Sequence, residues 1–532
     1  MTHFNSSINF QDTGYFSKMI CDYLDGIQDL SELYDQFPDL EGFKQQIETK
    51  RESFPKDSRK VLTQRLSEQT KHLNLSDSSL HNIELLENDN TFTVTTGHQL
   101  NLFTGPLYFL YKIISAVNLA AALKEEFPED NFVPVYWMAT EDHDFEEIGF
   151  FNFKGKKLRW KKEAKGAVGR MTTEGLDTVF EEFDKLLGGS KNAMYLRNLF
   201  KEAYLKHETL TDATRYLANE LFGAYGLVII DGDDQNLKRI FAPYVKDELL
   251  HQTSFKEVTE TNALMSGEYP IQVNPREVNL FYLDENLRER ILFEEGVYKV
   301  NQTDLVFSEE EMLSELESYP WKFSPNVLMR PLYQEVILPN LCYIGGGGEL
   351  AYWMQLKRYF DRVDVPFPIL LLRNSVLLIT EKQRDKMARL NISDIEIFLK
   401  QNELIKNKVK EISDLDLDFT DQRMKLQEMF DHFKSLALKT DKSFTGAVLA
   451  QEKKQLNGLR NLEKRLLKAQ KRKYKDAVNR ISLLQDELFP KQSLQERQMN
   501  FSEFYEVYGQ ELIKNLVDSL EPLQLEFDLI TL

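Results

Sequence analysis

The chain has 532 residues, 42% of them hydrophobic, which is enough for a large core and at least one additional module. Its 85 acidic and 66 basic residues give a formal net charge of -19, which makes nucleic acid and anionic lipid poor partners. Cys21 and Cys342 are the only cysteines, which excludes a disulfide framework and a cysteine-rich zinc site and suits a reducing compartment.

The first 90 residues are polar and carry short apolar repeats, such as Tyr23 and Ile27, which predict a helical segment packed on the main body. Their start lacks the basic residues and apolar block of a signal peptide. The most apolar later stretch is interrupted by Arg373 and Asn374, so we expect no membrane-spanning helix. The chain is therefore predicted to be cytoplasmic.

A repeated strand and helix pattern begins at residue 91. Residues 91–96 alternate β-forming side chains, the turn GHQLNLFTGP follows, and PLYFLYKIISAV has the apolar density of a partly buried helix. Further strands are predicted within 131–139, 226–234 and 341–349, and one or two more in FPILLLRNSVLLI. Strands that alternate with helices predict an α/β protein with a parallel, doubly wound sheet.

This core domain is predicted over residues 91–380, with insertions at about 151–225 and 250–325. The first insertion contains the hairpin-like stretch FNFKGKKLRW, and the second contains IQVNPREVNLFYL. Both segments interrupt the alternation of strands and helices, so they are predicted to be additions to the sheet and not part of it.

From residue 381 to 490 the composition changes to long charged helices. Apolar residues from Leu449 to Leu488 recur at steps of mostly three and four, the pattern of a coiled-coil seam. We expect one helix over about 446–488, paired antiparallel with a helix over 421–439. Residues 491–532 then resume a mixed pattern and are predicted to return to the core.

Candidate functional residues lie where the predicted strands end. In an open parallel sheet the carboxyl ends of the strands meet in one crevice, close to the amino ends of the helices that attract anions. The sequence places four loops there: Gly97–Thr104, Glu141–Asp144, Asp231–Asp234 and Gly345–Glu349.

The first of these loops combines glycines with polar side chains. Gly97 permits close approach of a ligand to the backbone, and His98 could donate a proton or hydrogen bond to a developing negative charge. Gln99, Asn101 and Thr104 are candidate substrate-binding residues of the same loop. The alternative is a tight connection whose histidine only caps the following helix.

The sequence EDHD places three carboxylates around one imidazole: Glu141, Asp142, His143 and Asp144. Such a cluster could hold a divalent metal, orient an ammonium group, or act as a base with a raised pKa. A solvated acidic loop is the alternative. No zinc site is expected, because His143 has no second histidine or cysteine at ligand spacing.

The glycine turn comprises Gly345, Gly346, Gly347 and Gly348, followed by Glu349. It is neither a Walker loop nor a dinucleotide fingerprint, so its predicted role is to bring backbone amides against an anionic or sugar ligand. A flexible turn is the alternative. The DGDD sequence at 231–234 is a weaker candidate, since such runs are more often solvated turns.

Two arginines, Arg330 and Arg373, lie within apolar stretches. A buried guanidinium requires a carboxylate or phosphate partner, which can belong to a substrate or to the protein itself. The basic run at 465–475 is most simply the solvated face of the coiled coil.

Several motifs in order resemble the bacillithiol biosynthesis cysteine-adding enzyme family. They are TGHQLNLFTGPLYFLYKI, PVYWMATEDHDFEEI, NLFYL, NVLMRPLYQEVILPN, YIGGGGELAYWMQLK and LLRNS, and the resemblance covers most of the chain. It implies a Rossmann-like core related to nucleotidylyl transferases, connecting-peptide insertions, and a coiled coil that supports a homodimer.

The activity implied by the resemblance is that of a cysteine ligase. The carboxylate of cysteine is activated and attacked by the amine of glucosaminyl malate, with ATP or another nucleotide as the expected cofactor and Mg²⁺ left open. The residues from Glu141 to Asp144 would orient or deprotonate the amine, and the arginines would hold the malate. Two alternatives stay open: a nucleotidylyl transferase or hydrolase acting on another sugar phosphate, and a nucleotide-binding coiled-coil scaffold.

Overall fold

Five parallel strands form the central sheet of the computed structural model, which describes residues 5–265 and 267–532. Their spatial order is β13-β12-β2-β3-β6. In chain order they are β2 (Thr91–His98), β3 (Asn131–Met138), β6 (Val228–Asp231), β12 (Asn340–Gly345) and β13 (Ile369–Leu372). The chain moves outward from β2 through β3 to β6 and then returns to the other side of β2, so the predicted doubly wound sheet is confirmed.

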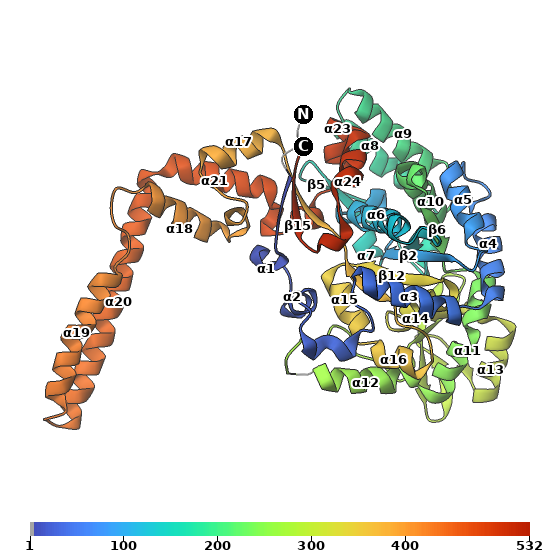
Figure 1. Cartoon of the computed structure of the whole chain (residues 1–532), viewed down its shortest axis with the longest axis horizontal. Helices are drawn as coiled ribbons and strands as arrows, with labels where there is room; N and C mark the ends of the chain where they lie inside the picture. Colours follow the sequence, from blue (N-terminus) through green and yellow to red (C-terminus); the bar gives the residue numbers. More distant parts are fainter. Residues whose placement is uncertain (1–4, 266) are drawn as a thin grey trace.

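Both faces of this sheet are buried, which explains why its strands read as continuous apolar runs. In β3, Val135 and Trp137 face one hydrophobic core, whereas Tyr136 and Met138 face another. Helix α6 (Tyr108–Glu126) packs on β2 and β3, and α3 (Leu40–Ser53) packs on β12 and β13. Figure 1 shows the sheet enclosed by helices.

The segment after β3 begins with the predicted hairpin, formed by β4 (Phe150–Phe153) and β5 (Lys156–Arg159). Three helices follow: α8 (Leu176–Leu186), α9 (Lys191–Leu205) and α10 (Leu210–Phe222). Their buried side chains share one core with Tyr136 and Met138 of β3, so this segment covers the face of the sheet to which those two side chains point.

The segment after β6 carries a second, antiparallel sheet in the order β10-β9-β8-β7-β11. Its strands are β7 (Leu280–Asp284), β8 (Leu287–Glu294), β9 (Val297–Val300), β10 (Val306–Phe307) and β11 (Phe323–Pro325), packed with α11 (Gln235–His251), α12 (Thr253–Met265) and α13 (Glu309–Ser318). The sheet presents Arg288 and Pro325 to the carboxyl ends of the central strands.

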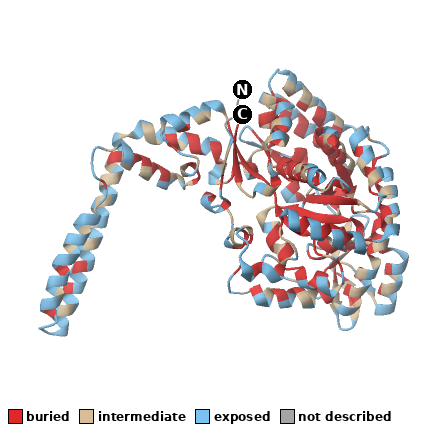
Figure 2. Ribbon diagram, in the orientation of Figure 1, coloured by how far each residue is buried: buried red, intermediate tan, exposed pale blue. Residues whose placement is uncertain are grey.

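Helices α19 (Thr420–Ala437) and α20 (Lys442–Lys473) form an arm that extends away from the main body (Figure 1). Helix α19 packs against α20 through Phe430, Ala437 and Val448, and most of the arm is exposed (Figure 2).

The prediction of one continuous helix over 446–488 is wrong, because α20 ends before Tyr474 and α21 (Lys475–Leu488) takes a new direction. Ile481, Leu484 and Leu488 of α21 are buried in the main core, and α21 contacts α18 (Gln401–Ile412). This burial sets the direction that the chain takes after Tyr474.

The C-terminal segment lies against the main body. Helix α22 (Gln495–Gln498) lies beside β14 (Ser375–Ile379) and is hydrogen-bonded to it. Leu378 N–H donates to the Gln495 side chain (3.0 Å), and the Gln495 side chain donates to the Leu378 carbonyl (3.0 Å). Strand β15 (Phe527–Thr531) pairs with both β14 and β1 (Asn5–Ile8), so the two ends of the described chain meet in one small sheet. Within residues 5–265 and 267–532, no helix is long and apolar enough to cross a membrane.

Candidate active site

A cavity of about 520 Å³ lies at the carboxyl ends of β2, β3 and β12. All four candidate loops contribute to its wall: Gly97, His98 and Gln99 from the first, Glu141 and Asp142 from the second, Gly232 alone from the third, and Gly346, Gly348 and Glu349 from the glycine turn. Arg330 and Arg373 also line it. The loops meet here because β2 lies between β3 and β12 and all three strands point the same way.

Other candidates from these loops lie outside the main cavity. Gly345 is buried as the last residue of β12, Gly347 faces Ile20, and Thr104 is buried beside the loop. The imidazole of His143 is turned toward Arg288 and Phe281, and Asp144 is exposed. Asn101 lines a second, smaller cavity next to the first. The structure therefore divides the EDHD sequence, with its first two carboxylates facing the cavity.

His98 is a buried, neutral group. Only 7% of it is exposed, and its ring packs at 5.0 Å from that of Phe109 and at 5.4 Å from that of Tyr108. Burial, reinforced by the Lys112 ammonium, lowers the pKa of His98 to about 3. Its Nε2 atom is buried and has no hydrogen-bond partner among the residues that the structure describes. At neutral pH the imidazole can therefore exchange a hydrogen bond with a ligand but carries no charge.

Glu141 is the carboxylate best suited to exchange a proton near neutrality. Burial raises its pKa to about 7, although it forms an ion pair with Lys238. Lys238 is itself buried and also donates to the Trp321 carbonyl (3.1 Å), so the pair is fixed in place. Asp142, beside it, accepts a hydrogen bond from Gln99 Nε2 (2.9 Å). A carboxyl group with a raised pKa and a hydrogen-bonded carboxylate thus lie side by side after β3.

Lys112 joins the first loop to the glycine turn, although our sequence analysis did not single it out. Its Nζ lies 2.6 Å from Glu349 Oε2 and donates to the Gly97 carbonyl (2.7 Å). Glu349 also accepts from the Tyr343 hydroxyl (2.9 Å) and from Gly346 N–H (2.8 Å). The signal that could have revealed Lys112 is a single cation within the otherwise apolar helix YFLYKIISAV.

The two predicted arginines differ in what they contact. Arg373 forms a buried ion pair with Glu496 (Nη2 to Oε1, 2.6 Å) and donates to Ser375 (2.9 Å), so its carboxylate partner is internal. Arg330 donates to Gln334 (3.1 Å) and lies over the rings of Trp137, Tyr343 and Trp353. In the described parts of the chain, Arg330 has no carboxylate within ion-pair distance, so its charge is available to a ligand.

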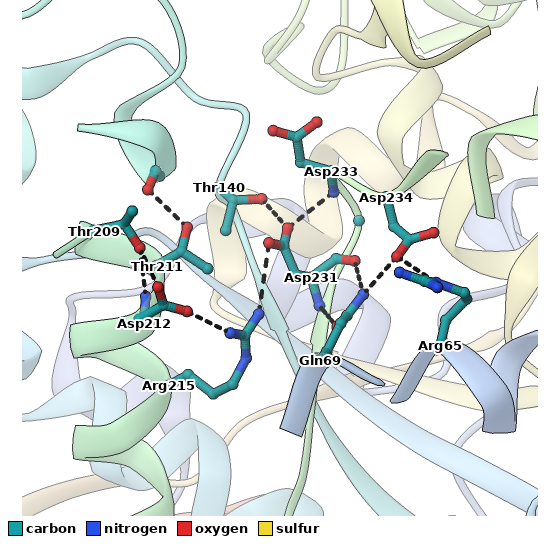
Figure 3. A network of polar contacts seen from close by, with 12 residues as sticks. Arg65, Gln69, Thr140, Thr209, Thr211, Asp212, Arg215, Asp231, Asp233 and Asp234 are labelled. Carbon is teal, nitrogen blue, oxygen red and sulfur yellow. Dashed lines mark hydrogen bonds and ion pairs between the residues drawn. The ribbon is translucent and has the colours of Figure 1, made fainter. Parts of the chain in front are cut away.

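The DGDD sequence after β6 is part of a structural network (Figure 3). Asp231 accepts from Thr140 Oγ1 (2.5 Å) and from Asp233 N–H (2.9 Å), and Arg215 lies 3.6 Å from its carboxylate. Asp234 caps α11 and pairs with Arg65 (2.8 Å). Only Gly232 of this loop reaches the cavity wall, so its carboxylates do not face a substrate, and Asp231 holds Thr140, next to Glu141.

Two further cations, Arg288 and Arg497, line the cavity from segments distant in sequence. Arg288 comes from the antiparallel sheet and Arg497 from α22, and neither was predicted to be a site residue. Among residues 5–265 and 267–532, no three His, Cys, Asp or Glu side chains are grouped so that they could hold a metal ion.

Two family models match the chain in succession. The N-terminal Rossmann-like domain of bacillithiol biosynthesis BshC matches residues 5–374, and the C-terminal coiled-coil domain of the same family matches residues 376–532. The chain belongs to the BshC family. The Rossmann-like core and the coiled coil implied by the sequence motifs are therefore confirmed.

Relatives within the BshC family align over nearly the whole chain. A protein from Flavobacterium johnsoniae is 58% identical over 525 residues, 99% of each chain. One from Christiangramia forsetii is 56% identical over 529 residues, 98% of each chain. Both bear the name "Putative cysteine ligase BshC".

Proposed function

We propose that this chain is a ligase that forms an amide bond between the carboxyl group of cysteine and the amine of glucosaminyl malate. The names of its relatives support a cysteine ligase of bacillithiol biosynthesis. The observation that carries the proposal is a single cavity that contains Glu141, whose pKa is near neutrality, together with Arg330, whose charge is available to a ligand.

In this proposal Glu141 is the general base. The sugar amine must lose a proton as it attacks the activated carboxyl carbon, and a carboxylate with a pKa of about 7 accepts that proton efficiently at neutral pH. Asp142 orients the amine by accepting one of its hydrogen bonds. Lys238 holds Glu141 in position, and the neutral His98 supplies a further hydrogen bond to a ligand.

The malate part of the substrate carries two carboxylates, which require cations without internal partners. Arg330 meets this requirement, and its planar guanidinium can bind a carboxylate through two parallel hydrogen bonds. Arg373 does not, because it already forms an ion pair with Glu496. We therefore assign Arg330, and not Arg373, to the malate.

Activation of a carboxyl group requires a leaving group, for which we propose ATP or another nucleotide, with Mg²⁺ bound through its phosphates. When bound, the nucleotide supplies the leaving group on the carboxyl. The residues at the start of α15 (Gly347–Met354) fit an anion, because this helix end offers N–H groups and an added Cβ at Gly348 would meet nothing within 4 Å.

We also propose that the chain acts as a cytoplasmic homodimer joined through the arm. Cys21 and Cys342 are both free, as expected in a reducing compartment. Met429, Phe433 and Leu436 of α19 recur at helical spacing and are all substantially exposed, beside the face of α19 that packs on α20 through Phe430 and Ala437. A second copy of the arm would bury this stripe.

The proposal is tested by incubating the purified chain with glucosaminyl malate, cysteine, ATP and Mg²⁺ and following the thiol product by mass spectrometry. We expect product only when both substrates are present. Release of phosphate or pyrophosphate without cysteine would instead support a nucleotidylyl transferase or hydrolase. A folded protein that turns over none of these mixtures would support a scaffold.

A further inference from the structure

A second cavity of about 430 Å³ adjoins the main one and has no role in the function described so far. The two cavities share Gln99, Tyr108 and Arg497. The second cavity is otherwise lined by the end of the first loop, by α7 (Phe145–Ile148) with the hairpin after it, and by the segment that follows α21. Its volume is within the range of small-molecule sites.

Two hydrogen-bond acceptors belong to the lining of this cavity. Asn101 is 7% exposed, and its Nδ2 donates to the Glu147 carbonyl (3.3 Å). Its Oδ1 atom is buried and meets no hydrogen-bond donor in the parts of the chain that the structure describes. A buried amide oxygen without a donor is costly unless a ligand supplies one. The carboxylate of Glu147 is a second acceptor at the same wall.

The lining of the same cavity also contains three cations: Lys157, Lys491 and Arg497. None of the three has a carboxylate within ion-pair distance among residues 5–265 and 267–532. Lys157 Nζ lies 3.4 Å from the centre of the Phe150 ring, and its pKa is lowered by burial and by Arg159 and Lys491. An anionic group between these side chains would relieve the repulsion.

We infer that the second cavity is the binding site of an α-amino acid in its zwitterionic form. Asn101 Oδ1 and the Glu147 carboxylate accept hydrogen bonds from the ammonium group, and Arg497 holds the carboxylate. Phe150 and Met499 offer an apolar surface for a small side chain. This inference rests on the proposed function, in which the amino acid is cysteine.

The contact between the two cavities supports this assignment. Gln99 Nε2 donates both to Asp142 (2.9 Å), in the main cavity, and to Glu147 (3.0 Å), in the second. Arg497 and Tyr108 also belong to both walls. A carboxyl group held by Arg497 is therefore at the boundary, where an amine bound beside Asp142 can reach it.

The test compares three variants of the full chain: Asn101→Leu, Arg497→Ala and Arg480→Ala. Asn101 lines only the second cavity, and Arg480 is an exposed arginine of α21 that serves as the matched control. We expect Asn101→Leu and Arg497→Ala to weaken L-cysteine binding in calorimetry by at least about tenfold, and to raise the KM for cysteine likewise. For Asn101→Leu the KM for glucosaminyl malate should change less than about twofold. Arg480→Ala should match the wild type.

An unchanged cysteine affinity in both folded variants would overturn the inference. The inference would also be overturned if Arg497→Ala lost the binding of inorganic phosphate but kept the binding of cysteine. Should Asn101→Leu fail to fold, Arg497→Ala decides, because its side chain is exposed. If the wild type forms product while neither variant affects cysteine, only this inference fails; if cysteine binds as expected but no product forms, only the ligase proposal fails.

Discussion

Lys112 and Glu349 form an ion pair across the point where the strand order of the central sheet reverses. The two atoms, Nζ and Oε2, lie 2.6 Å apart, and Lys112 is almost completely buried. Lys112 follows β2 and Glu349 follows β12, which are neighbours in space although more than two hundred residues separate them in the sequence. The pair therefore fixes the first loop against the glycine turn and sets the shape of the cavity between them.

Replacing Lys112 by Met should destabilise the protein by about 3 kcal/mol, because Glu349 would keep a largely buried charge without its partner. The double variant Lys112→Met/Glu349→Gln removes that charge and should recover most of the loss. Urea unfolding of both variants measures the difference. If the single and double variants were equally stable, the pair would not be what holds these loops together.

Activity should depend on the ionisation of Glu141. Only the carboxylate can accept a proton, so kcat/KM for the amino sugar should rise with pH and level off above about 7, the pKa that burial produces. Glu141→Gln should lower kcat by about 100-fold or more and remove this dependence. The exposed Glu317→Gln serves as the control and should keep the wild-type profile. A pH profile that persists in Glu141→Gln would assign the base to another residue.

The central sheet was predictable because its strands are buried on both faces and therefore read as apolar runs that end in polar loops. The same reasoning placed Gly97, Glu141 and Gly346 at one crevice. It could not find Arg288 or Arg497, because nothing local in an antiparallel strand or in a short helix after a coiled coil indicates which surface it will face.

The break at Tyr474 escaped prediction for a related reason. The apolar spacing of three and four continues across it, so the sequence alone favours one helix. The direction of α21 is set instead by the burial of Ile481 and Leu484 in the main core. The DGDD carboxylates likewise resemble a ligand site in sequence, and only the positions of Arg215 and Arg65 reveal their structural role.

The two cavity arginines should respond differently to substitution. Arg330→Lys keeps the charge but loses the planar fork, so the KM for glucosaminyl malate should rise by about tenfold or more while the melting temperature changes little. Arg373→Lys should mainly lower stability, by about 2 kcal/mol, since Glu496 would keep a charged partner but lose one of two charge-assisted hydrogen bonds in a buried site. Kinetics and thermal unfolding of both variants give the comparison. If both substitutions raised the KM for glucosaminyl malate equally, Arg373 would also have to be assigned to malate binding.

The oligomeric state should depend on the exposed stripe of α19. Phe433→Lys places a charge at its centre, between Met429 and Leu436, and should weaken a dimer at least about tenfold, given the free energy of burying an aromatic ring. Light scattering over a range of concentrations measures this. Leu483→Lys introduces the same charge at an exposed leucine of α21, outside the arm, and should leave association unchanged. A wild-type chain that is monomeric at all concentrations would contradict the proposed dimer.

Asp528 should make the stability of the protein depend on pH. It lies buried in β15, and burial raises its pKa from 3.8 to about 7, opposed by a hydrogen bond from Asn374 (3.3 Å). A folded-state pKa above the unfolded one means that the folded chain holds the proton more tightly, so the contribution of Asp528 to stability is fully present below about pH 4 and is lost as the pH rises through about 7. Asp528→Asn replaces the carboxyl group by an amide that does not titrate. Its amide oxygen can still accept the hydrogen bond from Asn374.

The variant should therefore gain on the order of 2 kcal/mol over the wild type at pH 8 and little at pH 4, when both are unfolded with urea. Asp518→Asn, a carboxylate in α24 with no ion pair among the described residues, is the control and should give the same difference from the wild type at both pH values. A gain from Asp528→Asn that was equal at pH 4 and pH 8 would mean that its carboxyl group does not titrate in this window.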